Sequence, residues 1–283
     1  MIFLYDGTYP GFLTAVYDIY YSGTSSLEDL RPASGETGLF GEERIVETNV
    51  PKAEKVISAF EDRCGKQAVR LLYRAFLSDF PGKEMKLFEF LRRGFREGKR
   101  LYALSGEDWF RDIGDMCRAV GNEAEKFRGI LRFSELEEGM LYAVIRPTHN
   151  VLPILAVHFK NRLSSLAWAV YDEKRKDAAV YAGGKVSIVS VPEVKKDLAY
   201  SGEEEDFRSL WRRYYRHMGI EERRNPRCRM NQVPKKYWGH LTEMEDPYNR
   251  EDLDLKGIPE TGQKKERLSG KTEKGLILKD RSG

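Results

Sequence analysis

The sequence predicts an α+β fold: an N-terminal strand plus helical bundle, then an antiparallel strand-strand-helix-strand-strand module with a C-terminal helix and basic loop. Two observations indicate this. Apolar residues recur at helical spacing up to about residue 128, and β-branched and aromatic residues dominate the short segments after Ile130. The apolar pattern is lost after Glu245. We therefore expect a mostly helical region over residues 1–129, an α+β module over residues 130–245 and a disordered tail over residues 246–283.

The N-terminal region begins with a strand and continues as helices. The segment MIFLYD is typical of a strand, and PGFLTAVYDIYYSG then carries apolar residues at helical spacing between Pro10 and Gly23. Residues 24–44 are rich in Ser, Gly, Pro and Glu, which favours a connecting loop. From Pro51 to about Arg128, successive apolar stripes end near Gly or Pro, which predicts a bundle of about four helices.

The module after Ile130 alternates strand and helix signals. ILRFSEL and MLYAVIRP are strand-like and are separated by EEG, a hairpin signal. NVLPILAVHFKNRL then predicts a helix with Asn150 as its N-cap. AWAVYDE and DAAVYAGG predict a second hairpin that turns at KRK, and KVSIV predicts a further strand. EEEDFRSLWRRYYRHMG predicts a helix whose opening acids suit the positive end of the helix dipole.

The composition is that of a soluble globular protein and excludes several functional classes. No apolar run approaches the roughly 18 residues of a membrane helix, so we expect no membrane partner. The N-terminus lacks the basic region and cleavage site of a secretion signal, and the three cysteines are far apart. We therefore expect a reducing, cytoplasmic location. Dinucleotide-binding, Walker A, nucleophile-elbow and zinc-protease motifs are all missing, so we expect no cofactor and no metal site.

The most distinctive segment runs from Trp211 to His240 and combines positive charge with aromatic rings. The whole chain has a net charge of only +3, but between Arg208 and Lys236 ten lysines and arginines face two glutamates, a local charge of +8. Pro226 and Pro234 interrupt any single regular element, which favours an irregular arginine-rich loop. Guanidinium groups pair with phosphates and aromatic faces stack on bases, so this segment indicates a nucleic-acid surface.

The candidate nucleic-acid-binding residues of this segment are Arg212, Arg213, Arg216, Arg223, Arg224, Asn225, Arg227, Lys235, Lys236, Tyr237 and Trp238. In the alternative interpretation, the arginines pair with acids elsewhere on the protein.

A second constellation lies in RPTHNVLPILAVHFKNRL and supplies the candidate catalytic residues His149, Asn150 and His158. A helix N-terminus favours an anion such as phosphate, and a histidine beside it can transfer a proton. In the alternative interpretation, Asn150 only caps the helix and His158 is a core histidine. Two histidines nine residues apart are a weak ligand set, which agrees with the expectation of no metal site.

Several long blocks resemble one bacterial family. The blocks are YDGTYPGFLTAVYDIY, LYRAFLSDFPGKEMKLFEFLRRGF, FRGILRFSELEEGMLYAVIRPTHNVLPILAVHFKNRL and LWRRYYRHMGIEERRNPRCRMNQVPKKYWGHLTEM, in that order over about residues 1–245. The chain is thereby similar to a family of DNA-metabolism and DNA-repair proteins encoded beside a radical-SAM protein that acts on DNA. Some members are fused to a uracil-DNA glycosylase-superfamily domain, which we do not find here. The resemblance implies DNA and a radical-SAM protein as partners, and it supplies no catalytic residues.

Three functions are consistent with these observations. The first is a DNA-binding accessory protein that presents single-stranded or damaged DNA, rather than a specific duplex sequence, to the radical-SAM enzyme. The runner-up is a nucleic-acid-directed hydrolase, similar to a glycosylase, with His149 as its acid or base. The third is a protein-docking module that does not bind nucleic acid.

Overall fold

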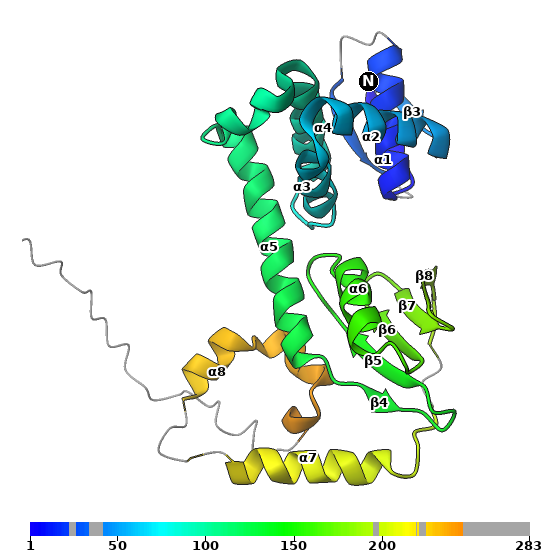
Figure 1. Cartoon of the computed structure of the whole chain (residues 1–283), viewed down its shortest axis with the longest axis vertical. Coiled ribbons are helices and arrows are strands. Elements are labelled where there is room, and N and C mark those ends of the chain that lie inside the picture. Colours follow the sequence, from blue (N-terminus) through cyan, green and yellow to red (C-terminus); the bar gives the residue numbers. More distant parts are fainter. Residues whose placement is uncertain (23–26, 34–41, 195–197, 219, 221–224, 246–283) are drawn as a thin grey trace, which may run out of the picture.

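The computed structural model describes residues 1–22, 27–33, 42–194, 198–218, 220 and 225–245. The tail predicted over residues 246–283 lies outside the described residues. The predicted α+β class is confirmed. One end holds the first strands and helices, and the long helix α5 (Asp108–Ile130) connects them to a second sheet and the C-terminal helices (Figure 1).

A small parallel sheet forms the N-terminal end. Its central strand β1 (Ile2–Tyr5) pairs with β2 (Asp29–Pro32) on one side and β3 (Glu43–Ile45) on the other, both in parallel. The prediction of a simple connecting loop over residues 24–44 is wrong in this respect. Strands of four and three residues with mixed charge show no alternating pattern in the sequence, and backbone pairing with β1 decides their conformation.

The turn after β1 explains the stretch YDGTYPG. The Asp6 carboxylate accepts hydrogen bonds from Thr8 and from the Thr48 hydroxyl. Thr8 in turn caps helix α1 (Tyr9–Tyr21) by accepting from the Gly11 N–H at 3.0 Å. A Cβ atom on Gly11 would lie 2.1 Å from Asp6 Oδ1, so only glycine leaves room for this carboxylate. The stretch therefore has a structural role.

Four helices follow, as the apolar stripes predict. They are α2 (Val50–Cys64), α3 (Lys66–Phe76), α4 (Lys83–Glu97) and α5, with a short 3-10 helix η1 (Gly98–Leu104) before α5. Their apolar faces meet in a core that contains the fully buried side chains Phe60, Leu72 and Phe90. Gly94 allows α4 to approach α2, because its missing side chain leaves space for the Phe60 ring.

The second sheet has five strands in the order β4-β5-β6-β7-β8. These strands and their connecting helix are β4 (Ser134–Glu135), β5 (Leu141–Ile145), α6 (Leu152–Arg162), β6 (Trp168–Asp172), β7 (Asp177–Ala182) and β8 (Lys185–Ser190). The hairpins β4–β5, β6–β7 and β7–β8 are antiparallel, but β5 and β6 are parallel. The expectation of a wholly antiparallel module is wrong here, because α6 returns the chain to the starting edge of the sheet.

The C-terminal part contains the predicted helix and, where an irregular basic loop is predicted, further short helices. It contains α7 (Glu204–Met218), α8 (Pro226–Gln232) and two 3-10 helices, η3 (Lys235–His240) and η4 (Thr242–Met244). Asn225 caps α8 by accepting from the Cys228 N–H, and Pro226 occupies the first turn, where its missing N–H costs nothing. Pro234 directly precedes η3. The prolines therefore begin short helices.

The buried core extends across the predicted division at residues 129 and 130. One cluster of buried side chains runs from Phe3 in β1 to Tyr237 in η3, and α5 contacts both the α3–α4 helices and α6. The division into two regions stays a prediction. Within the described ranges, none of the helices combines the length and apolar character needed to span a membrane.

Gly94→Ala tests the close approach of α2 and α4. The new Cβ would lie 2.3 Å from Phe60 Cε2, so we expect a loss of about 1–3 kcal/mol in the free energy of unfolding. Gly114 in the middle of α5 is the control, since a Cβ there meets nothing within 4 Å. Gly114→Ala should instead gain about 0.5–1 kcal/mol. Urea unfolding of both variants measures the difference, and equal effects would contradict this packing.

Candidate nucleic-acid interface

A buried carboxylate on α5 holds the C-terminal segment in place. Glu123 is only 6% exposed and accepts from the backbone N–H groups of Thr148 at 2.8 Å and His149 at 2.6 Å. The Tyr237 hydroxyl also donates to it, and Lys236 Nζ lies 3.5 Å away. A single side chain thus joins α5, the loop before α6 and η3.

The hydrogen bonds keep Glu123 ionised. Burial by itself raises the pKa of this carboxyl, but the donors Tyr237, His149 and Thr148, with the charge of Lys236, lower the pKa overall. Burial and the adjacent carboxylate raise the pKa of Tyr237, which therefore stays a neutral donor. The group has the chemistry of a structural anchor, because its described partners occupy both carboxylate oxygens.

His149 belongs to the same junction. Its Nδ1 accepts the Asp79 N–H at 3.1 Å, so the proton of the neutral ring resides on Nε2. The ring stacks on Phe80, with centroids 5.9 Å apart and planes inclined by 10°. Burial lowers the pKa of His149. Protonation of Nδ1 would break the bond to Asp79, so the neutral ring serves to fasten the loop between α3 and α4 to the loop before α6.

The other two candidate catalytic residues occupy separate structural roles. The prediction that Asn150 caps the helix is wrong: Val151 is the N-cap residue, and the Asn150 N–H donates to the Leu77 carbonyl instead. His158 lies on α6 with its ring against Phe159, and its Nε2 is buried without a partner among the described residues. Burial lowers the pKa of His158 as well. In the described part of the chain, neither a hydrogen bond nor an ion pair joins His149 to His158.

A second buried carboxylate, Glu243 in η4, organises the aromatic residues of α7. It accepts from the Trp211 Nε1–H at 2.9 Å and forms an ion pair with Arg132 at 2.8 Å. The Arg132 guanidinium lies over the Trp211 ring, 5.3 Å from its centroid. On α7 itself, Trp211 stacks on Tyr214, with centroids 5.8 Å apart and planes inclined by 26°. Trp211 is thereby fixed in orientation before any ligand arrives.

One face of α7 exposes apolar side chains to solvent. Phe207, Leu210, Tyr214 and Met218 are between 53% and 63% exposed, and Trp211 beside them is 37% exposed. Their spacing places all of them on one side of the helix. Such a stripe normally packs into a core, but α7 lies across the lower end of the structure, where it contacts η4, Arg132 and the backbone of Glu135 (Figure 1). The stripe is available for a partner.

The arginines of α7 divide into two groups. Arg208 and Arg212 form ion pairs with Glu245, and Arg212 also pairs with Glu205, as the alternative interpretation expects. The side chains of Arg213 and Arg216 are exposed to solvent. The acids Glu204, Glu205 and Asp206 occupy the first turn, so positive charge is concentrated toward the C-terminal half of α7.

The remaining candidate binding residues are divided between surface and core. Arg227 and Lys235 are exposed, while Asn225 is used as the cap of α8 and Lys236 bonds to the Thr148 hydroxyl and Glu123. Tyr237 and Trp238 are buried, with Trp238 Nε1 donating to the Val233 carbonyl, so neither ring is placed to stack on a base. Arg223 and Arg224 lie outside the described residues.

Glu123 and Glu243 are absent from the sequence-based candidates. The sequence does not distinguish either glutamate from the many others. Each is buried against distant partners: Tyr237 lies more than 100 residues from Glu123, and Glu243 lies more than 100 residues from Arg132. The stripe of α7 does have a sequence signal, the helical spacing of Phe207, Leu210, Tyr214 and Met218. That signal indicates burial, however, and only the structure shows the exposed side chains.

Glu123→Gln tests the anchoring role. The amide presents an NH₂ group to donors that now bond a carboxylate, so we expect a loss of about 1–3 kcal/mol in the free energy of unfolding at pH 7. Because the folded-state pKa is lowered, the advantage of the carboxylate exists above its ordinary pKa and is lost as pH falls through the folded value. The difference between wild type and variant should therefore shrink below about pH 4.

The control is Glu125→Gln, two residues along the same helix, where the side chain is 71% exposed and pairs with Arg128. It should change the free energy of unfolding by less than about 0.5 kcal/mol. Denaturant unfolding between acid and neutral pH measures both variants. Equal stability losses at the two positions would contradict the role of Glu123.

The sequence was compared with models of known protein families. A family model described as a domain of unknown function, DUF4130, matches residues 81–243, more than half of the chain. The match spans α4 through η4 and includes Glu123, Glu243 and the whole of α7. No curated protein and no solved structure matches the chain. DNA binding, DNA repair and a radical-SAM partner stay predictions, and the chain belongs to the DUF4130 family.

Proposed function

We propose that the chain binds single-stranded nucleic acid through the exposed side of α7. The α7 face is defined by the apolar stripe of Phe207, Leu210, Trp211, Tyr214 and Met218, and the helix carries Arg213 and Arg216 on its other exposed sides. The observation that carries the proposal is the Trp211–Tyr214 stack, which Glu243 and Arg132 hold on a helix that also exposes Arg213 and Arg216.

The chemistry of the α7 face suits an unpaired strand. Stacking of a base on an aromatic side chain contributes about 1–3 kcal/mol and does not depend on the base sequence. Tyr214 is the more accessible ring of the stack, at 53% exposed. Bases in a duplex already stack on their neighbours, so an exposed ring stacks more readily on the face of an unpaired base. Arg213 and Arg216 supply guanidinium groups for the phosphates.

Charge distribution restricts where the strand lies. The acids of the first turn of α7 repel phosphates, and the arginines that follow attract them. The strand therefore occupies the C-terminal half of α7. Trp211 is already fixed by Glu243, so less side-chain entropy is lost when a base stacks there.

We further propose that the nucleic acid is DNA and that the chain presents it to a radical-SAM enzyme. Support for this extension comes from the family resemblance of the sequence blocks. The division of labour assigns recognition to this chain and the chemical step to the partner.

A second candidate function is protein docking through the same α7 face. Leu210 and Met218 are exposed aliphatic side chains that cannot stack on bases as a ring does. Together with Phe207 they have the spacing of an amphipathic helix that packs into an apolar groove of another protein. The two functions differ in their response to salt and to DNA.

Fluorescence anisotropy with a labelled thymidine-rich single strand tests the first function. Tyr214→Ala should weaken binding by about 5- to 100-fold, the loss of one stacked base. Arg213→Ala/Arg216→Ala should reduce the dependence of log affinity on log salt by about 0.7 for each lost phosphate contact, measured from about 50 to about 300 mM salt.

The control is Arg111→Ala/Arg118→Ala on α5, where both arginines are exposed and each is paired with an acid three residues earlier. It should bind as wild type does. Wild-type affinity in the α7 variants would contradict the proposed surface. Absence of binding at about 50 mM salt would exclude nucleic acid and favour protein docking.

A further inference from the structure

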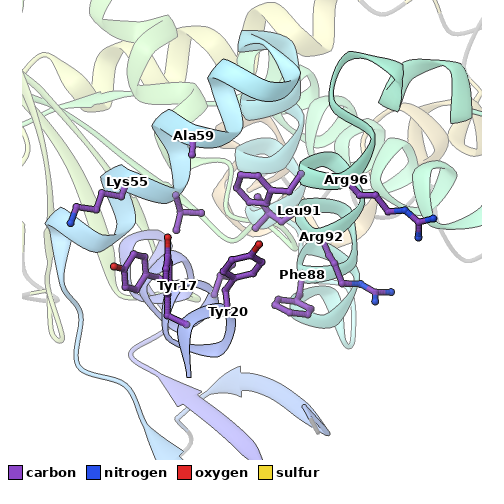
Figure 2. Close-up of a pocket in the computed structure, with 12 residues that line it drawn as sticks. Tyr17, Tyr20, Lys55, Ala59, Phe88, Leu91, Arg92 and Arg96 are labelled. Carbon is purple, nitrogen blue, oxygen red and sulfur yellow. The ribbon is translucent and has the colours of Figure 1, made fainter. Parts of the chain in front are cut away.

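Helices α1, α2 and α4 enclose an open groove at the opposite end of the molecule from α7 (Figures 1 and 2). Its volume is about 540 Å³, within the range of roughly 300–1,000 Å³ typical of small-molecule sites. Packing explains why it is open: α2 contacts both α1 and α4 and forms the floor, while α1 and α4 form the two walls.

Aromatic rings dominate the groove walls. Tyr17, Tyr20 and Tyr21 come from α1, and Phe88 and Phe95 come from α4. Tyr20 and Tyr21 are 72% and 70% exposed, although each contacts another ring: Tyr17 and Tyr21 have centroids 4.4 Å apart, and Tyr20 and Tyr21 5.5 Å. Figure 2 shows Tyr17 and Tyr20 on one wall and Phe88 on the other. A flat ring inserted between the walls would contact aromatic faces on both sides.

The charged residues that line the groove are all cations. The lining residues include three cations, Lys55 of α2 and Arg92 and Arg96 of α4, and no acid. Lys55 lies at one edge and the two arginines at the other (Figure 2). Arg92 pairs with Glu89 at 2.6 Å, and Arg96 pairs with Glu97 at the longer distance of 3.4 Å, with its side chain 79% exposed. Lys55, and Arg96 with its longer ion pair, are therefore the cations better placed to meet an anion at the two edges.

We propose that this groove binds a small molecule that combines a planar aromatic ring with an anionic group. The ring lies between Tyr20 and Phe88, where its burial and its ring contacts supply most of the affinity. The anion lies at an edge of the groove, next to Lys55 or Arg96, and these residues select against neutral and cationic molecules of the same shape.

This ligand chemistry has two sources, a nucleoside monophosphate and an aromatic carboxylic acid. Both carry a flat ring and an acid, and they differ in the charge and geometry of the anion. The groove and the α7 face share no residues, so each proposal can be tested independently of the other.

Fluorescence titration with 8-anilinonaphthalene-1-sulfonate provides a direct test, because the probe carries both a flat ring system and an anion. Its neutral analogue N-phenyl-1-naphthylamine lacks the sulfonate. We expect one saturable site that binds the sulfonate more tightly than the neutral analogue. Tyr20→Ala should weaken the binding by about 3- to 10-fold. Lys55→Gln/Arg96→Gln should weaken the sulfonate by about 2- to 5-fold and leave the neutral analogue unchanged.

Matched controls separate the groove from other surfaces. Arg118→Gln removes an arginine of similar exposure on α5, 72% against 79% for Arg96, and should not change the titration. Circular dichroism and thermal unfolding check that each variant is folded. We expect folded variants, because the side chains of Tyr20 and Arg96 are largely exposed and contribute little to the core. Loss of the fluorescence signal in Tyr214→Ala, with Tyr20→Ala unchanged, would place the probe on α7 and overturn the proposal.

Displacement of the probe then identifies the source of the ligand. Displacement of the probe by deoxyadenosine monophosphate supports a nucleotide, and displacement by 2-naphthoate supports an aromatic carboxylate. Inorganic phosphate has no ring to insert between the walls, so it should not displace the probe. Equal affinity for the sulfonate and the neutral analogue, or displacement by neither competitor, would overturn the assignment of an aromatic anion.

Discussion

The buried carboxylate of Glu123 is the interaction on which the arrangement of the chain depends. It lies on the helix that links the two ends of the molecule, and its partners come from the loop before α6 and from η3. An ionised group in a core is tolerated only when donors surround it, so the positions of these segments are mutually required. Through Tyr237 the same interaction fixes the start of the segment that leads to Glu243, and hence the place of α7.

The buried carboxylates of Glu123 and Glu243 have different consequences. Glu123 and His149 join parts of the scaffold, and their bonds to backbone N–H groups leave them little freedom for chemistry. Glu243 instead positions an exposed ring system, because its oxygens bond both Trp211 and Arg132. A polar residue in the core thereby determines the orientation of aromatic residues on the surface. A ring that is already held in place loses less side-chain entropy when a partner binds it.

The sequence predicts the long elements well and the long-range contacts poorly. Helices such as α5 and strands such as β6 follow from their periodicity, but β2 and β3 are too short to show one. The parallel pairing of β5 with β6 depends on the path of α6, which composition does not encode. Tyr237 and Trp238 lie beside two lysines and resemble surface residues, yet the turn of η3 directs both rings inward. Arg213 and Arg216 are indicated by charge, and the exposure of Tyr214 beside them required the structure.

The molecule presents two aromatic surfaces with basic neighbours, one on α7 and one in the groove of α1, α2 and α4, and the first is the central claim. Ultraviolet cross-linking to a thymidine-rich single strand, with mass-spectrometric mapping of the modified residues, tests that claim most directly. The account predicts adducts on the α7 peptides that contain Trp211 or Tyr214. Adducts confined to other parts of the chain, or none under conditions where the strand is bound, would contradict it.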